Sequence, residues 1–418
     1  MASYFWVGGS GTWGATNTKF ATSSGGVPGT ATPTAADNVT VDNNSGSPTI
    51  TLATSVTQTC FALNITATNC TITGLSAGLN LNSLNISSTA LNWTATTPVT
   101  FLGGGSMTTA LRTISSPIIF STGTTSLTGP FNTSSSATLT GGIITLSNNT
   151  LSCSGFSSNV TSTRAINFST AGVIKTGVGG IVINGTNFSY SGTSNFNQST
   201  NGTVTLTTGF TAANAQSINF TSSVVSVTET NNNIYNNFIS TLYGGTIANN
   251  TRTIYGNFTI GVSTTLTSGS NVTTFAATSG TQTFTTNAKT VNFPVTFGTG
   301  TGTTTFAISG AITQSAGTAF TFKNGTLQFS ASTTNTVGDF ITSGTTLKSL
   351  TSSVSGTRAT LSQASGTVNA SYLSVKDSAA TGGATWNALT TSNNTDAGNN
   401  TGWIFSTFSP VPQFFQLF

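Results

Sequence analysis

Side chains that could act as acids, bases or nucleophiles are scarce in this chain. It has 418 residues and no histidine, so Ser-His-Asp, Cys-His and histidine-metal arrangements are excluded. Its six acidic residues are Asp37, Asp42, Glu229, Asp339, Asp377 and Asp396. A glycosidase needs a pair of carboxyl groups, one on each side of the scissile bond, and most of these six stand alone in the sequence. We therefore predict that the protein is not an enzyme, although carboxylates from different turns of a fold could still form a depolymerase site.

The cysteines do not indicate a metal or redox site. Cys60, Cys70 and Cys153 form no Cys-x-x-Cys pair, and three is an odd number for a disulfide framework. Cys60 and Cys70 could join neighbouring strands or remain buried as free thiols. The glycine-rich stretch 101–107 lacks the Lys-Ser/Thr pair of a phosphate-binding loop. The sequence predicts no catalytic residues, no metal and no cofactor.

Arginine, although rare, recurs in one short pattern. Arg164 belongs to "STRAINF" (162–168), which resembles "LRTISSPIIF" (111–120) and "AQSINF" (215–220). The aligned residues are Arg112, Arg164, Gln216, Arg252, Lys289 and Arg358. Their intervals approximate multiples of about 17.5 residues, while turns of about 26 residues explain only the two 52-residue intervals. We interpret Arg164 as an outer-edge residue that caps backbone carbonyls; the alternative is a row of cations binding anionic glycans.

Charge is low and dispersed, and the apolar content suffices for a folded core. Charged residues are 4% of the chain, the net charge is +4, and no run of Lys or Arg occurs. A nucleic-acid partner is therefore not expected. Hydrophobic residues make up 36% of the chain, which argues against disorder. No stretch approaches the roughly 20 apolar residues of a membrane-spanning helix, so membrane insertion is not expected.

Short alternating segments predict the fold. "TVTLTTGF" (203–210) and "GTAFTFKNGTLQFS" (317–330) place Val, Leu or Phe on one face and Thr, Ser or Asn on the other. Gly, Asn-Gly and Ser-Gly punctuate these segments as turns. A unit this short cannot bury its own apolar face, whereas stacked units can. We predict an all-β, elongated parallel β-helix (β-solenoid) of about 20 short rungs, with phenylalanine, the commonest aromatic residue at 28, suited to fill its interior.

The two ends differ in composition from the middle. We expect an N-terminal cap or attachment segment over residues 1–48, a β-solenoid over 49–405, and a Phe/Pro-rich hydrophobic C-terminal tail over 406–418. An apolar tail is more stable when covered, so the ends are the candidate assembly contacts. The predicted partner-contact residues are Phe405, Phe408, Phe414, Phe415, Phe418, Trp6 and Trp13.

Both ends also resemble a known class of protein. "YFWVGGSGTW" (4–13) with "PTAADNVTVD" (33–42), and "YLSVKDSAATGGATWNA" (372–388) with "NNTGWIF" (399–405), resemble the ends of Ser/Thr/Asn/Gly-rich β-helical structural proteins of marine and environmental bacteriophages. Such proteins often carry Asn-Trp where this chain has Lys19-Phe20. The resemblance implies a virion appendage: a tail fibre, a spike or a head-associated fibre.

Three functions remain open from the sequence. The first is a non-enzymatic virion structural protein used in host-surface attachment, made in the host cytoplasm without a signal peptide. We expect other virion proteins, further copies of the chain (a trimer is one form) and a host surface glycan or protein as its partners. The second is a bacterial extracellular adhesin or filament subunit. The third is an ice-binding β-solenoid, suggested by the Thr-x-Thr steps at 49–51, 71–73 and 203–205, whose uneven spacing argues against it.

Overall fold

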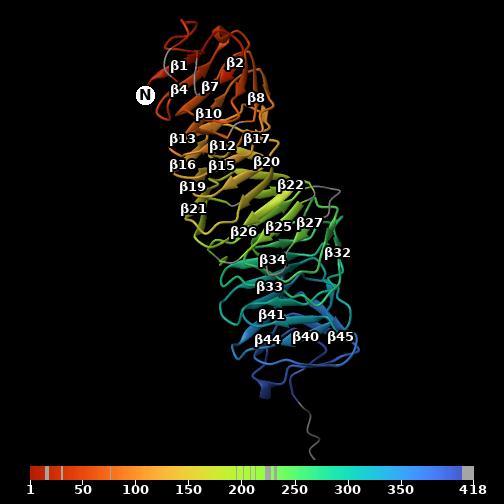
Figure 1. Ribbon diagram of the computed structural model, residues 1–418. Helices are drawn as coiled ribbons and strands as arrows, with labels where there is room; N and C mark the ends of the chain where they lie inside the picture. Colours follow the sequence, from red (N-terminus) through yellow and green to blue (C-terminus); the bar gives the residue numbers. More distant parts are fainter. Residues whose placement is uncertain are drawn as a thin grey trace, which may run out of the picture. The chain divides into compact units, whose positions relative to one another are not determined.

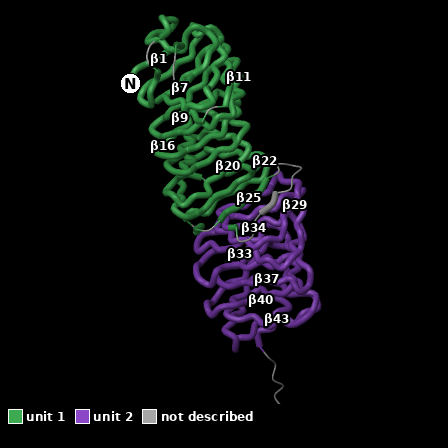
Figure 2. Tube along the Cα trace, viewed as in Figure 1, with its two compact units in different colours: residues 1–233 green, residues 234–418 purple. Residues whose placement is uncertain are grey.

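The protein is an all-β parallel β-solenoid of about 17 turns, which confirms the predicted fold class (Figure 1). The computed structural model describes residues 1–406 except 15–17, 30–31, 76, 194, 201, 208, 212, 222–226 and 230–232, and describes no side chains for 227–229. The chain divides into two compact units, Met1–Asn233 and Ile234–Phe418 (Figure 2). This division was not predicted from the sequence.

In the first unit, a typical turn contributes three strands, and strands of successive turns pair to form three stacks. The first stack contains β1 (Ser3–Trp6), β4 (Asn38–Val41), β7 (Ala62–Ile65), β10 (Ser83–Ile86), β13 (Gly105–Thr108), β16 (Thr124–Leu127), β19 (Gly142–Thr145), β21 (Arg164–Asn167) and β23 (Phe188–Ser191). The second begins with β2 (Gly11–Trp13), β5 (Thr49–Leu52), β8 (Asn69–Gly74) and β11 (Ala90–Trp93), and continues through β14 (Thr113–Ile114) and β17 (Phe131–Thr133). The third begins with β6 (Thr57–Thr59), β9 (Gly78–Leu81), β12 (Val99–Phe101), β15 (Ile118–Phe120) and β18 (Ala137–Leu139).

Two long strands, β20 (Thr150–Ser158) and β22 (Val173–Ile183), belong to both the second and the third stack. Beyond them, β24 (Phe196–Gln198) and β26 (Gln216–Phe220) continue the second stack, while β25 (Gly202–Leu206) and β27 (Val227–Glu229) continue the third. The register between β20 and β22 shifts between Cys153 and Gly155, where the strands bend from one stack into the other. This bend forms the site described below.

The first unit is held together by rows of identical or similar side chains. Leu63 aligns with Leu84 and Leu84 with Met107, and all three are at most 2% exposed. Because side chains alternate along a strand, Asn64 and Asn85, which follow Leu63 and Leu84, point outward. The alternation read from the sequence therefore corresponds to the inside and outside of the solenoid.

The second unit repeats the three-stack arrangement. One stack contains β31 (Phe258–Thr259), β34 (Thr281–Thr285), β36 (Thr305–Ser309), β38 (Thr326–Phe329), β41 (Lys348–Ser352), β44 (Leu373–Val375) and β47 (Thr395–Asp396). Another contains β30 (Arg252–Ile254), β33 (Thr273–Phe275), β35 (Val295–Phe297), β37 (Ala319–Phe322) and β40 (Asp339–Thr342), and then β43 (Thr367–Asn369), β46 (Thr385–Asn387) and β48 (Trp403–Ile404). The third contains β29 (Thr246–Ile247) with β32 (Thr265–Leu266), and β39 (Thr334–Thr336) with β42 (Ala359–Gln363) and β45 (Ser378–Gly382). The unit begins within β28 (Asn233–Ile239).

Phenylalanine fills the interior of the second unit. Phe275 stacks on Phe297 with ring centroids 4.7 Å apart, and Phe297 lies 5.1 Å from Phe320. In the neighbouring stack, Phe258 and Phe284 stack at 5.2 Å. These rings are at most 1% exposed, and a ring without a polar atom needs no hydrogen-bond partner there. The predicted interior role of phenylalanine is confirmed for these rings.

The predicted turn length of 17 to 18 residues is wrong as a general rule. Beyond the N-terminal turn, paired residues are separated by as few as 17 positions (Trp386 and Trp403) and as many as 26 (Phe258 and Phe284). The recurring arginine pattern also marks different sides of the solenoid, since Arg112 precedes β14 of the second stack and Arg164 begins β21 of the first. The intervals between them are therefore not whole numbers of turns.

Successive turns approach closely where glycine occupies the bends. Gly103 has a φ of 84°, and a Cβ atom there would lie 2.3 Å from the carbonyl oxygen of Thr122 in the next turn. Only glycine accommodates both the left-handed backbone and this approach. The frequent glycines of the sequence thus include positions that permit parallel stacking.

Candidate functional site

The predicted partner residues Trp6 and Trp13 lie inside the N-terminal end of the first unit. The ring of Phe20 meets both indoles edge to face, at 5.3 Å from Trp6 and 5.5 Å from Trp13. Trp6 also donates from Nε1 to the carbonyl of Gly9 at 2.8 Å. Phe20 belongs to β3 (Phe20–Ala21), which pairs antiparallel with β1. These side chains stabilise the first turn, and a contact of Trp6 or Trp13 with a partner stays a prediction.

The predicted C-terminal contacts lie largely outside the described residues. Phe408, Phe414, Phe415 and Phe418 belong to that part of the chain. Phe405 is half-buried, and its carbonyl accepts a 3.0 Å hydrogen bond from the amide of Thr390. That bond ties Phe405 to η2 (Thr390–Ser392) in the second unit.

Arg164 is not the outer-edge residue that the sequence suggested. Its side chain is 1% exposed, and its guanidinium lies over the ring of Phe188 at 5.3 Å. It donates to the hydroxyl of Ser158 and to four backbone carbonyls, those of Ser158, Ser162, Asn184 and Thr186. Burial lowers the pKa of the guanidinium. The expected capping of carbonyls is therefore found, but inside the solenoid, because the side chain lies between turns and donates to carbonyls of both.

Arg252 and Arg112, two of the other recurring cations, do not form a row with Arg164. Arg252 is fully buried, with its guanidinium 5.4 Å from the ring of Phe238. Arg112 is exposed and donates to the carbonyls of Ser88 and Thr89. Buried guanidinium groups have no surface to offer a ligand, so the structure does not favour an arginine row that binds anionic glycans.

All three cysteines are buried free thiols. Burial raises the pKa of Cys60, Cys70 and Cys153 to about 12. Of the two states left open for Cys60 and Cys70, the structure contains the thiols rather than the disulfide. Such groups remain protonated near neutral pH and are poor nucleophiles.

The Thr-x-Thr steps are in better register than their sequence spacing suggested. Thr49 pairs with Thr71 and Thr51 with Thr73, so two neighbouring turns present matched threonine pairs. In the next turn Asn92 pairs with Thr71, which ends this matched pattern. Two turns provide a much smaller regular surface than an ice-binding plane requires, although the register between them is exact.

Longer rows of hydroxyls occur in the second unit. One outward row runs through six successive turns: Thr281, Thr305, Thr326, Ser349, Ser374 and Thr395. Neighbouring strands lie about 4.8 Å apart, so the hydroxyls repeat at about that spacing. Each row presents donors and acceptors without charge, a surface suited to contact with other hydroxyl-rich surfaces.

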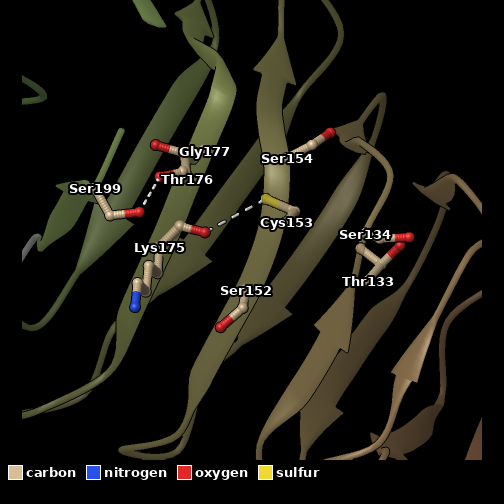
Figure 3. Close-up of a pocket in the computed structure, with 9 residues that line it drawn as sticks. All are labelled: Thr133, Ser134, Ser152, Cys153, Ser154, Lys175, Thr176, Gly177 and Ser199. Atoms are coloured by element: carbon tan, nitrogen blue, oxygen red, sulfur yellow. Dashed lines mark hydrogen bonds between the residues drawn. The ribbon is translucent and has the colours of Figure 1, made fainter. Parts of the chain in front are cut away.

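A polar depression of about 260 Å³ lies at the bend of β20 and β22 in the first unit (Figure 3). Ser152, Cys153 and Ser154 of β20 form its middle. The neighbouring turns contribute the residues Thr133, Ser134, Lys175, Thr176, Gly177 and Ser199. The register shifts at this point: between the pairs Cys153–Thr176 and Gly155–Gly180, β20 has one residue, Ser154, whereas β22 has three, 177–179. The extra residues of β22 interrupt the regular ladder beside the depression.

Hydrogen bonds hold the wall of the depression in place. The buried amide of Gln198 donates to the carbonyls of Gly177 and Thr200, both at 2.8 Å, and accepts from the hydroxyl of Thr176 at 2.7 Å. The hydroxyl of Ser199 donates to the Thr176 carbonyl at 2.7 Å. At the floor, the Cys153 thiol contacts the carbonyl of Lys175 at 3.8 Å. The backbone around the depression is therefore well supported.

Three polar side chains at the depression keep their hydrogen-bonding capacity. Within the described part of the chain, the ammonium of Lys175 and the hydroxyls of Ser152 and Ser154 form no hydrogen bond with another protein group. Lys175 is exposed, and no carboxylate lines the depression. The site thus combines one positive charge with hydroxyl donors and acceptors, which can bind an anionic or hydroxyl-rich ligand.

Other kinds of site are not found among the described residues. No group of three or more His, Cys, Asp or Glu side chains lies close enough to hold a metal ion. No helix in this part of the chain is both long and apolar enough to cross a membrane.

Comparison with known proteins finds no relative. No protein-family model matches the chain, and neither a search of curated proteins nor a search of solved structures finds a similar one.

The depression was not predicted from the sequence, because its residues come from four separate turns. The available signal was local: Lys175 is followed by "TGVGG" (176–180), where the alternation of apolar and polar residues is interrupted. The capping role of Lys348 was not predicted either: its buried ammonium donates to the carbonyls of Ser371 and Tyr372. Burial lowers the pKa of Lys348, which resembles Arg164 in its capping role.

Proposed function

We propose that the protein is a non-enzymatic structural component of a bacteriophage particle, a fibre, spike or decoration appendage, that displays its solenoid surface to a host surface. The observation that carries the proposal is the parallel solenoid itself, whose outward side chains form uncharged hydroxyl and amide rows. A solenoid has the regular, extended surfaces that binding proteins of this architecture use.

Two further observations support a structural role. The buried cations and thiols are engaged in packing: Arg164 and Lys348 cap carbonyls, and burial raises the pKa of all three cysteines. The ends of the chain resemble those of phage β-helical proteins, as described above. Both point to stability and display rather than catalysis.

Attachment is the proposed use of the displayed surface. Rows of Thr, Ser and Asn can exchange hydrogen bonds with a host glycan without the desolvation cost of charged groups. Many weak contacts along a row, multiplied by several copies of the chain, would give strong attachment through avidity.

The test is to locate the protein on purified particles. Antibodies raised against the purified chain, with gold labels seen by electron microscopy, are expected to decorate particles at defined positions, and mass spectrometry of the same particles to detect the chain. A matched lysate of uninfected cells is the control. Detection only in uninfected cells or on the outer surface of bacteria would contradict the proposal and favour the bacterial adhesin.

A further inference from the structure

We propose that the depression around Lys175 binds an anionic sugar ring, one that carries a carboxylate or a sulfate group. This inference rests on the proposed attachment function and names the class of ligand for one site on the displayed surface. The depression is small, about 260 Å³, against the roughly 300–1,000 Å³ of most small-molecule pockets. A single ring of a longer glycan suits it better than a large compact ligand.

The charge of the site selects an anion. Lys175 is exposed, and no carboxylate is present among the residues that line the depression. The other Lys and Arg side chains of this unit are engaged elsewhere. Lys19 donates to the Gly8 carbonyl, Arg164 is buried between turns, and Arg112 donates to the Ser88 and Thr89 carbonyls. A single cation pairs with a single negative group, whereas binding to nucleic acid needs contacts with many phosphates.

The hydroxyls of the site suit a sugar rather than a simple anion. Ser152 is the partner of Lys175 in the adjacent turn, and Ser154 lies two residues further along β20. Their hydroxyls can donate to and accept from ring hydroxyls while the ammonium holds the acidic group. Figure 3 shows the Lys175 side chain of β22 beside Ser152 of the neighbouring strand β20, with Ser154 further along β20 beyond Cys153.

The surface on both sides of the depression extends this chemistry. Asn132 pairs with Ser152, and Asn197 pairs with Lys175, so a continuous outward row of four polar residues crosses four turns. A longer acidic glycan therefore meets amide groups on either side of its bound ring. The walls are held by Gln198 and Thr176, so little ordering is needed when the ligand binds.

The test measures binding of the purified full-length protein to an array of immobilised oligosaccharides that contain uronic acid or sulfated sugars, each beside its neutral counterpart. We expect retention on at least one acidic oligosaccharide and much weaker retention on its neutral form. Comparing the uronic-acid oligosaccharides with the sulfated ones shows whether the site binds a carboxylate or a sulfate group. Lys175→Met is expected to weaken binding about 10- to 150-fold, the range for a hydrogen bond to a charged group.

Two variants serve as checks on that result. Lys376→Met removes one exposed positive charge from the second unit and is expected to leave binding unchanged. Ser152→Ala combined with Ser154→Ala keeps the charge and should weaken binding through the lost hydroxyls. Failure to bind any acidic sugar, equal binding of neutral forms, preference for nucleic acid, or equal effects of Lys175→Met and Lys376→Met would each overturn the inference. Because the assay uses purified protein, its result is independent of whether the chain is found on particles.

Discussion

Replacing Arg164 by methionine should destabilise the middle of the first unit. The guanidinium makes five hydrogen bonds, four of them between 2.6 and 2.9 Å. Each bond to a charged donor contributes roughly 1.5–3 kcal/mol, while burying the guanidinium costs several kcal/mol. Methionine removes both the hydrogen bonds and the cost of burying the charge, but it leaves the carbonyls of Ser158, Asn184 and Thr186 without that donor. We expect a net loss of about 3–5 kcal/mol, as for other broken buried charge networks.

Hydrogen exchange is the appropriate measurement, because a chain with two compact units need not unfold in one step. The amides of β21 and β23 should exchange with a free energy of opening lower by about 3–5 kcal/mol in Arg164→Met. Arg112→Met is the matched control: this arginine is exposed and its bonds to the carbonyls of Ser88 and Thr89 compete with water, so a loss of at most about 1 kcal/mol is expected. A change below about 0.5 kcal/mol in Arg164→Met, or equal changes in both variants, would refute the assigned role of the buried guanidinium.

Three further predictions follow from the packing and the pKa shifts. Phe297→Ala removes the ring packed between Phe275 and Phe320 and should lower the free energy of opening of β33, β35 and β37, measured by hydrogen exchange, by about 3–5 kcal/mol. Phe297→Leu should cost clearly less, and equal costs would contradict the ring packing. The three thiols, with pKa values raised to about 12, should resist alkylation at pH 8 in the native protein and react after unfolding. Because the thiols of the unfolded chain lose their protons near pH 9, the free energy of unfolding should fall as the pH rises from 9 towards 12. Hydrogen bonds from the Thr34 side chain, and from the amides of Ala2 and Thr34, lower the pKa of Asp37 in the folded protein. The Asp37 carboxylate should therefore stabilise the N-terminal end above pH 3.8, its ordinary pKa, and this stabilisation should be lost as the pH falls through the lower pKa of the folded state. In Asp37→Asn, the fluorescence of the N-terminal tryptophans should no longer show this acid transition. A variant whose fluorescence changes at the same pH as that of the wild type would contradict the assigned role of Asp37.

Local pattern was sufficient to predict the type of fold. Alternating segments such as 317–330 correspond to β37 and β38, with Phe320, Phe322 and Phe329 inside. Alternation is a property of each strand alone, so it can be read without knowing which strands meet. Parallel stacking followed from the shortness of the units, none of which can bury its own apolar side.

The length of each turn could not be read in the same way. The loops between strands vary, and paired residues are therefore separated by 17 positions in one turn and 26 in another. Residues in the bends contribute little to the core, so nothing constrains their number in the sequence. A recurring arginine was consequently mistaken for a measure of the turn.

The position of Arg164 and the depression around Lys175 were decided by the tertiary structure. Both depend on groups from several turns: Arg164 reaches carbonyls on either side of β21, and the depression collects side chains from four turns. The sequence by itself determined the alternation, the apolar interior and the low charge, because these are properties of single strands and of composition. Which cation is buried and which remains free to bind depends on the register between turns, and that register exists only once the chain has stacked.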